Sequence, residues 1–212
     1  MQQITSEIPT TAVPFIFETD DNGFENETVK VRKWTRDEYY KMAELGFFDG
    51  KRVELIEGEI IEMSPMTKLH AVGIRKVLAI LNKIFTAGFV VDSQLPMSLG
   101  KINEPEPDVA VIKGKLEDLL ISHPKTAELI VEVSVSTLRL DRTKKAALYA
   151  KNKVQDYWIL NLKSRCLEVY RQPKKDKKLG FIYIESRIFT ETDEVSPLAM
   201  PQAKIKIADL LP

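Results

Sequence analysis

One seven-residue run restricts the fold more than any other feature of the chain. Residues 128–134, Glu-Leu-Ile-Val-Glu-Val-Ser, are mostly apolar and partly β-branched, which is typical of a buried strand. Glu132 lies within this run, among Leu129, Ile130, Val131 and Val133. An unpaired buried charge costs several kcal/mol, so Glu132 needs a cationic partner, a metal ion or a proton.

The surrounding pattern predicts an α/β domain. We expect runs 89–93, 107–112 and 128–134 to form central strands, and 157–160 and 166–170 to form two more. A helix from Arg142 to about Lys151, capped by Asp141, separates the third run from the fourth. The charged residues 172–180 are expected to form a long loop, after which 181–184 returns as a hairpin strand.

The first half of the chain predicts an arm followed by the start of the domain. Residues 1–33 are polar and irregular, and we expect one domain over 34–212. Thr35 and Glu38 form a capping pair for a short helix that ends at Gly46. Residues 52–63 are typical of a hairpin around Glu57-Gly58. Apolar residues at helical spacing predict a further helix closed by Gly88, namely Ile74, Val77, Leu78, Leu81, Ile84 and Phe85.

Composition excludes several classes of protein. The 31 Lys and Arg residues balance 31 Asp and Glu residues, so attraction to a polyanion must come from a local patch. Cys166 is the sole cysteine, which excludes an intramolecular disulfide and a cysteine-rich zinc site and fits a reducing compartment. On an alternating strand, Cys166 is expected simply to pack. Neither a phosphate-binding glycine-rich loop nor a nucleophile elbow is visible, which argues against nucleoside triphosphatases and α/β-hydrolases.

The start of the chain gives an expectation about location. Residues 1–11 lack the basic and apolar segments of a secretion signal, and no apolar run is long enough to span a bilayer. We therefore expect a cytoplasmic protein with no membrane partner.

Two acids and one lysine carry the chemical hypothesis. Asp108 begins one strand and Glu132 lies inside another, so the two carboxylates could share a Mg²⁺ ion, which prefers oxygen ligands. Lys145 falls in the first turn of the expected helix, where a cation opposes the macrodipole. From there it could stabilise the charge that develops in phosphodiester hydrolysis.

A purely structural alternative also accounts for these residues. Glu132 could form a buried ion pair with Lys145 or Arg142, and Asp108 could accept hydrogen bonds from amides at a strand end. Taken by itself, the pattern slightly favours this arrangement over a metal site.

Other polar residues are secondary candidates. His70 is expected as a hydrogen-bonded histidine at a helix start, Gln94 could hold substrate or water near Asp108, and Tyr149 could orient the Lys145 ammonium. His123 has no neighbour at metal-ligand spacing, so we assign it no chemical role. A run of lysines could meet phosphates or simply be solvated: Lys174, Lys175, Lys177 and Lys178.

Several short motifs, taken in order, resemble the Uma2 family, formerly DUF820. The motifs lie between about Trp34 and Tyr170 and are Val53-Glu-Leu-Ile-Glu-Gly-Glu59, Ser64-Pro65, His70, Pro105-Glu-Pro-Asp-Val109, Glu132-Val-Ser134, Asp141-Arg-Thr-Lys-Lys-Ala-Ala-Leu-Tyr-Ala150 and Tyr157-Trp-Ile159. The resemblance implies a restriction-endonuclease-like PD-(D/E)xK fold, with a mixed central β-sheet flanked by helices, and endonuclease activity.

The resemblance also implies roles for individual residues. Asp108 and Glu132 correspond to the metal-binding acids, and Glu54 to an acid nearer the N-terminus that completes the site. Ser134 stands where the family motif usually has its lysine, so Lys145 is the expected replacement from the next helix. Asn161 and Val135 depart from the family pattern at positions where an acid and a polar residue are common.

Two functions follow as hypotheses. The first is a Mg²⁺-dependent endodeoxyribonuclease, with Mn²⁺ as a possible substitute, acting on DNA. The second is a catalytically idle module of the same fold that binds nucleic acid or a protein partner. A homodimer is expected under the first, because enzymes that cut both strands often pair two copies.

Overall fold

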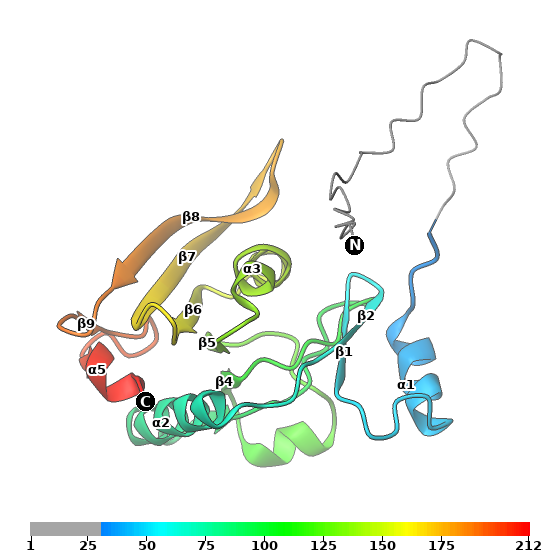
Figure 1. The fold of residues 1–212 in the computed structure, drawn as a ribbon, viewed down its shortest axis with the longest axis horizontal. Coiled ribbons are helices and arrows are strands. Elements are labelled where there is room, and N and C mark those ends of the chain that lie inside the picture. The colour runs from blue at the N-terminus through cyan, green and yellow to red at the C-terminus, as the bar shows by residue number, and fades with distance from the viewer. Residues whose placement is uncertain (1–30) are drawn as a thin grey trace, which may run out of the picture. The chain divides into compact units, whose positions relative to one another are not determined.

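The computed structural model describes residues 31–212, so positions 1–30 of the expected arm lie outside the described residues. Residues Arg32–Pro212 form one compact unit. Its main sheet has six strands in the order β3-β4-β5-β6-β7-β8 (Figure 1). The strands are β3 Phe89–Asp92, β4 Val109–Lys113, β5 Leu129–Ser134, β6 Asp156–Asn161, β7 Cys166–Asp176 and β8 Gly180–Phe189.

The sheet is mixed, as the sequence predicted. β5 and β6 are parallel, and every other neighbouring pair in the sheet is antiparallel. The parallel pair requires a crossover, which the helical segment between β5 and β6 supplies. This segment consists of α3 Leu138–Leu140, the π-helix η2 Asp141–Lys145 and α4 Ala146–Lys151.

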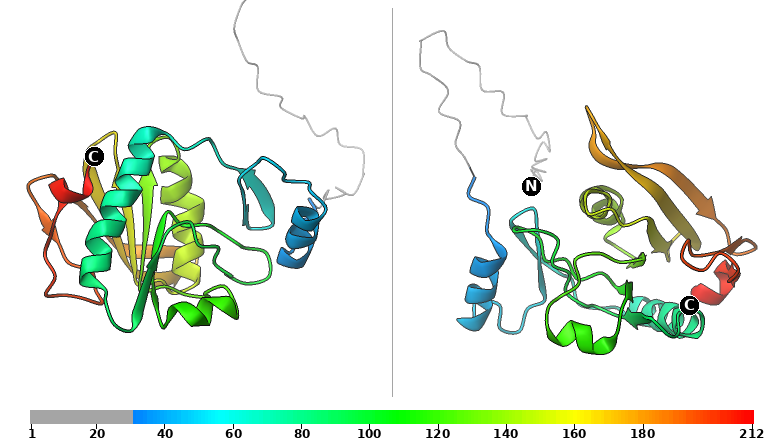
Figure 2. Two further views of the ribbon diagram at one scale, coloured as in Figure 1. Left: turned by 90° about the horizontal axis from the view of Figure 1, so that it is seen from below. Right: turned by 180° about the vertical axis from the view of Figure 1, so that it is seen from behind.

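Helices cover both faces of the sheet (Figures 1 and 2). α2, Lys68–Ile84, packs on the face that carries Val131 and Val133 of β5. α4 packs on the opposite face, which carries Ile130. Side chains alternate along a strand, so Glu132 points towards the α3–η2–α4 segment.

A small hairpin stands beside the main sheet. β1, Val53–Ile56, pairs with β2, Glu59–Glu62, through a two-residue turn at Glu57 (φ 52°) and Gly58 (φ 73°). Positive φ at both turn residues is the type I′ geometry of tight hairpins, which confirms the expected turn. An antiparallel bridge between Leu55 and Glu104 joins β1 to the segment that leads into β4.

The expected capping of the first helix is confirmed. α1, Arg36–Glu44, begins with a capping box between Thr35 and Glu38, and Gly46 follows it with φ 80°. The remaining short elements are η1 Leu116–Leu120, β9 Glu194–Val195, β10 Ile205–Lys206 and α5 Ile207–Leu210. Cys166 is buried, and burial raises the pKa of its thiol.

Two boundaries differ from the prediction because tertiary contacts override local signals. The helix after β5 begins at Leu138, with Thr137 as its N-cap residue, so Asp141 lies inside the helix and does not cap it. α2 ends at Ile84, and Gly88 (φ 84°) lies in the following turn, where its carbonyl accepts from the Gly114 N–H.

Two strand predictions were also wrong in detail. β3 is an edge strand and not a central one, since β4 is its only neighbour among residues 31–212. The charged residues 172–180 do not form a long loop, because β7 continues to Asp176 and β8 starts at Gly180. Charged side chains are compatible with a strand whose faces meet water, which is why their composition misled the prediction.

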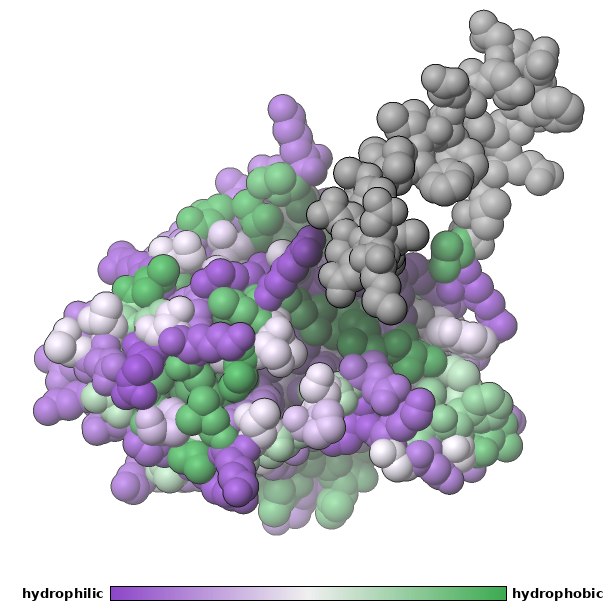
Figure 3. All heavy atoms as spheres, viewed as in Figure 1, coloured by the Kyte–Doolittle hydropathy of each residue, from purple (hydrophilic) through white to green (hydrophobic). Residues whose placement is uncertain are grey.

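Among residues 31–212, none of the helices combines the length and the apolar character needed to cross a membrane. Figure 3 shows hydrophobic and hydrophilic residues intermixed over the face seen in Figure 1.

Candidate active site

One pocket collects most of the residues predicted for the site. Asp108, Glu132, Lys145, Glu54 and His70 all line it, although they come from five different parts of the chain. Its cavity volume is about 120 Å³. A single water molecule needs about 10–15 Å³ of such space, so the pocket has room for an ion and several waters.

Glu132 is held at the base of this pocket by two donors. Its Oε1 atom accepts a hydrogen bond from Lys145 Nζ at 3.1 Å and another from the Tyr149 hydroxyl at 2.7 Å. Tyr149 therefore fixes the carboxylate and does not orient the ammonium, contrary to the prediction. The phenol and the ammonium converge on one oxygen because Lys145 and Tyr149 are one helical turn apart.

Lys145 lies between two buried acids. Its Nζ atom is 3.1 Å from Glu132 Oε1 and 3.1 Å from Glu54 Oε1, and all three side chains are almost fully buried. Glu54 is fixed in turn by the backbone N–H of Glu106, which donates to Glu54 Oε2 at 3.1 Å. Because the helix starts at Leu138, Lys145 is in its second turn, so the expected conflict with the macrodipole does not arise.

Asp108 occupies the position just before β4. Its Oδ2 atom accepts from the backbone N–H of Val133 at 2.8 Å and lies 3.0 Å from His70 Nε2. His70 is in the first turn of α2, whose N-cap Thr67 accepts the His70 N–H, so it does start a helix. Its ring nevertheless points into the pocket and towards Asp108.

The two contacts expected if Glu132 and Asp108 had only a structural role are both present. Glu132 forms a buried ion pair with Lys145, and Asp108 accepts from a strand amide at Val133. Arg142 takes no part in the pocket, because it pairs with Glu168 at 2.7–2.8 Å. These contacts occupy one oxygen of Glu132 and one of Asp108.

Asp141 is a pocket residue that the sequence pattern assigned to helix capping. It is 2% exposed, lines the pocket and accepts from Thr137 Oγ1 at 2.8 Å. Its carbonyl accepts from the Ala146 N–H, which is the i→i+5 hydrogen bond of the π-helix η2. The same carbonyl accepts from the Tyr157 hydroxyl at 2.9 Å. Single turns of π-helix inside an α-helical segment occur frequently at functional sites. The spacing of Asp141 four residues before Lys145 was the signal that could have placed it here.

The electrostatics of the pocket are dominated by acids. Burial raises the pKa of Glu132 well above its usual range; Lys145 opposes this rise, while Asp108, Asp141 and Glu54 add to it. Burial likewise raises the pKa of Asp141. Desolvation acts to lower the pKa of Lys145, but the carboxylates outweigh it and the pKa is raised. The pocket thus holds more carboxyl groups than the single ammonium of Lys145 can pair.

The donor set suits a divalent cation of the Mg²⁺ type. Carboxylate oxygens are its preferred protein ligands, and one or two are enough when water and phosphate complete the shell. Within residues 31–212, no group of three or more His, Cys, Asp or Glu side chains is arranged to hold a metal ion. A metal ion in this pocket would therefore be held by at most two of these side chains. Asp108 and Glu132 are the pair expected from the sequence.

Three other residues singled out in the sequence differ in where they lie relative to the pocket. Gln94 has a positive φ of 55°, its backbone N–H donates to the carbonyl of Pro107, next to Asp108, at 3.0 Å, and its carboxamide lies 3.1–3.3 Å from the Arg52 guanidinium. Asn161 lies outside the pocket lining and donates to Glu168 at 3.2 Å. Val135, by contrast, does line the pocket, in the place where a polar residue was expected.

His123 is not a plain solvated loop residue. Its Nδ1 atom is 2.6 Å from Glu104 Oε1 and 3.1 Å from the Tyr40 hydroxyl. Glu104 is 2% exposed and also lies 2.5 Å from Arg36 Nε. This second polar cluster fixes the segment before β4 onto α1, a tertiary arrangement that no local motif indicates.

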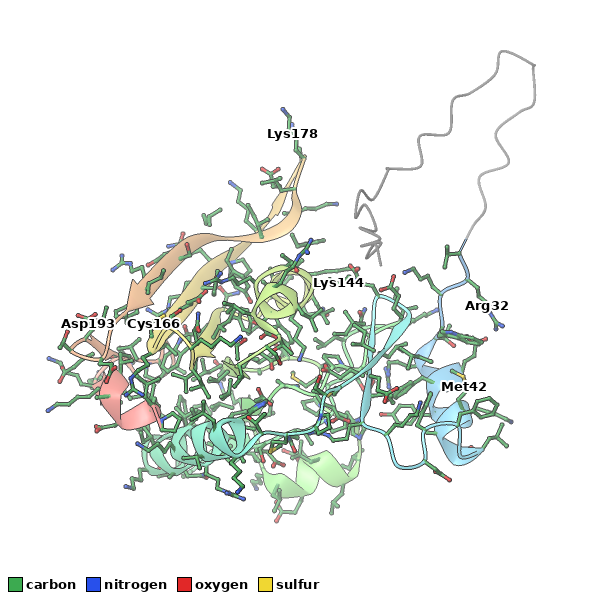
Figure 4. The ribbon with its side chains drawn as sticks, in the orientation of Figure 1. Arg32, Met42, Lys144, Cys166, Lys178 and Asp193 are labelled. Atoms are coloured by element: carbon green, nitrogen blue, oxygen red, sulfur yellow. The ribbon has the colours of Figure 1, made fainter. Side chains whose placement is uncertain are left out.

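Two lysines near the end of β7 and two in the turn to β8 form the outer part of the hairpin. Lys174, Lys175, Lys177 and Lys178 are all exposed, and Figure 4 shows Lys178 at the hairpin tip. Lys144 lies on the side of the helical segment that faces β2, where it pairs with Glu59 at 2.5 Å (Figure 4).

Comparison with known proteins agrees with this architecture. The family model Uma2, described as "Putative restriction endonuclease", matches residues 36–208. This chain belongs to the Uma2 family. Within it, the crystal structure of "a putative nuclease belonging to DUF820" from Anabaena variabilis ATCC 29413 has a TM-score of 0.59 at 16% identity, covering 74% of this chain and 88% of that one. No curated protein matches the chain.

The Uma2 assignment confirms the family resemblance drawn from the short motifs. The structural likeness, at this low identity, concerns the fold, and it confirms the expected mixed sheet flanked by helices. The description of the family supports a nuclease.

Proposed function

We propose that this Uma2 protein is a Mg²⁺-dependent endonuclease that hydrolyses phosphodiester bonds in DNA. The observation that carries the proposal is the convergence of Asp108, Glu132 and Lys145 in one open pocket that contains an excess of acids. Buried carboxylates with perturbed pKa values in a cleft are typical of functional sites.

Each residue has a distinct role in this proposal. Asp108 and Glu132 hold the ion through carboxylate oxygens, and Tyr149 and Lys145 keep Glu132 in place. A bound Mg²⁺ ion polarises a phosphoryl oxygen and lowers the pKa of a coordinated water. The Lys145 ammonium stabilises negative charge on the scissile phosphate, and Glu54 holds that ammonium towards the pocket.

His70 is proposed as a positioning residue. Its Nε2 atom is 3.0 Å from the Asp108 oxygen that also accepts from the Val133 backbone. Among the described residues this nitrogen makes no hydrogen bond, so the ring is proposed to restrict the rotamers of Asp108 by direct contact and to leave the other carboxylate oxygen free for the pocket. Outer partners of this kind commonly orient metal ligands.

Contacts to the nucleic-acid backbone are proposed to come from local cations. Because basic and acidic residues balance over the chain, phosphates must be met by a patch. The exposed lysines of the β7–β8 hairpin provide such a patch, and Lys144 stands close to the pocket, next to β2. Neutralising phosphates in this way supplies most non-specific affinity for nucleic acid.

The second candidate function is a catalytically idle module that binds nucleic acid or a protein partner. One observation favours it: Lys145 and the Val133 N–H already give Glu132 and Asp108 partners from the protein itself. In that case the pocket would be a stable polar core with an open side.

A cleavage assay separates the two functions. The purified chain would be incubated with supercoiled plasmid, single-stranded DNA or RNA, with Mg²⁺, with Mn²⁺ or with a chelator. We expect metal-dependent cleavage of DNA that is lost in Asp108→Asn, Glu132→Gln and Lys145→Met. Glu168→Gln is the matched control, because Glu168 is buried on the same face of the sheet but pairs with Arg142 outside the pocket.

Circular dichroism would show that each variant is folded, so that a loss of cleavage can be assigned to the pocket. Cleavage that persists in all three pocket variants overturns the assignment of the site. A folded wild-type chain that binds DNA but cleaves none of the substrates with either metal supports the idle module.

A further inference from the structure

β8 is an open edge of the six-stranded sheet. Over the described residues, β8 pairs with β7 and with no other strand. One row of its backbone N–H and C=O groups therefore has no neighbouring strand. Such an edge is a ready template for a further strand, and edge-to-edge addition is a common mode of protein recognition.

The exposed side chains of β8 include two large hydrophobic residues. Ile184 is 55% exposed and Ile188 is 67% exposed, with the exposed Ser186 between them. Residues two apart on a strand share a face, so these three form a row. Hydrophobic residues mixed with hydrophilic ones are visible on the surface over β7 and β8 in Figure 3.

The strand is chemically symmetric about Ser186. Residues 184–188 are Ile-Glu-Ser-Arg-Ile, so each side of the serine carries one charge and then one isoleucine, and the two charges are opposite. In an antiparallel pair of two such strands centred on Ser186, Ile184 faces Ile188 of the second copy. Glu185 then faces Arg187 of the second copy, and both contacts occur twice. Apolar and opposite-charge pairs across strands are the stabilising kinds.

The charges also select this register. Two identical antiparallel strands can slip only by two residues while keeping each side chain on its face. A slip in one direction sets Glu185 opposite Glu185, and a slip in the other sets Arg187 opposite Arg187. Within one chain, Arg187 Nε lies 3.0 Å from Glu185 Oε1, so in the paired strands each charge would exchange this partner for the opposite charge of the second copy.

We propose that two copies of this chain associate through antiparallel pairing of their β8 strands about Ser186. A second copy is the favoured occupant because the strand complements itself in both charge and apolar contact. The proposal is independent of the proposed nuclease activity, since β8 contributes no residue to the pocket lining.

Disulfide trapping tests this register directly. In Ser186→Cys, the two introduced thiols would be directly opposed, with Cα atoms about 4.5–5.5 Å apart, which is within disulfide range. In Ile184→Cys, the thiols would be about 13 Å apart along the strands and could not be joined. Cys166 is buried and stays in both variants. Oxidised full-length protein would be analysed by non-reducing electrophoresis and light scattering.

The expected result is a covalent dimer for Ser186→Cys and none for Ile184→Cys. Adding Glu185→Arg to Ser186→Cys should abolish the cross-link, because it sets like charges opposite Arg187, and adding Arg187→Glu as well should restore it. Circular dichroism would show that each variant is folded. Equal cross-linking at positions 184 and 186, no cross-linking at 186, or cross-linking at 186 that ignores charge reversal would overturn the proposal.

Discussion

Lys145 Nζ lies 3.1 Å from Glu132 Oε1, and both residues are 3% exposed. A buried ion pair is a weak source of stability, because the cost of desolvating both charges offsets their attraction. Glu54 and Asp141 add further negative charge to the same pocket. An arrangement with more acid than it can neutralise is better explained by a cation or substrate than by stability.

Replacing Glu132 by Gln should separate stability from metal binding. The amide oxygen can still accept from Tyr149 and Lys145, while one of the crowded negative charges is removed. We expect the free energy of unfolding without metal to be unchanged or higher, and the rise in melting temperature with saturating Mg²⁺ to be lost. Thermal melts with and without Mg²⁺ measure both quantities. Glu168→Gln should keep the Mg²⁺-dependent rise; a rise that survives Glu132→Gln would count against Glu132 as a ligand.

Gly73 permits the close packing of α2 on β5. A Cβ atom at this position would lie 2.8 Å from Val133 Cγ1. Glycine to alanine normally favours a helix, yet here overpacking should lower the free energy of unfolding by about 1–3 kcal/mol. Urea denaturation of Gly73→Ala measures the loss. Combining it with Val133→Ala should cost less than the sum of the two single changes, and strict additivity would contradict the contact.

Gly58 is required by both the turn and its neighbour. Its φ is 73°, and an added Cβ would lie 2.6 Å from Lys33 Cβ. Gly50 has almost the same φ, 74°, but open space around an added Cβ, so Gly50→Ala isolates the backbone cost of about 1–2 kcal/mol. We expect Gly58→Ala to destabilise the protein more than Gly50→Ala in chemical denaturation. Equal losses in the free energy of unfolding would mean that Lys33 moves away from the added Cβ at no cost.

Glu168 should contribute a pH-dependent share of stability. Burial acts to raise the pKa of Glu168, but hydrogen bonds from Arg142, Tyr170 and Asn161 outweigh it and the pKa is lowered. A depressed folded-state pKa gives stability that is present above the unfolded value of about 4.3 and is lost as pH falls through the folded value. Denaturation curves should therefore show a smaller loss on acidification for Glu168→Gln than for the wild type. Parallel curves would contradict the lowered pKa.

The features that could be predicted from the sequence were those fixed by local chemistry. The capping box at Thr35 and the Glu57-Gly58 turn depend on neighbouring residues alone. Glu132 was identifiable because a lone acid in an apolar strand is costly wherever the strand lies. The approach of Lys145 to Glu132 followed from a helix that crosses back over a parallel pair of strands.

The missed features depend on contacts between distant segments. Asp141 enters the pocket from the π-helix η2, and its carbonyl accepts a hydrogen bond from the hydroxyl of Tyr157 on β6. His123 acquires a partner only because Glu104 is brought beside it. The extension of β7 and β8 through residues rich in lysine is decided by their mutual pairing, which composition does not reveal.

Anomalous diffraction from crystals soaked in Mn²⁺ tests Asp108 and Glu132 as shared metal ligands most directly. The expected result is one anomalous peak in the pocket, within coordination distance of a carboxylate oxygen from each residue, and no peak in Asp108→Asn crystals soaked in the same way. A soaked wild-type crystal with no peak near these two oxygens, or with an unchanged peak in Asp108→Asn, would contradict a metal-dependent nuclease site built on this pair.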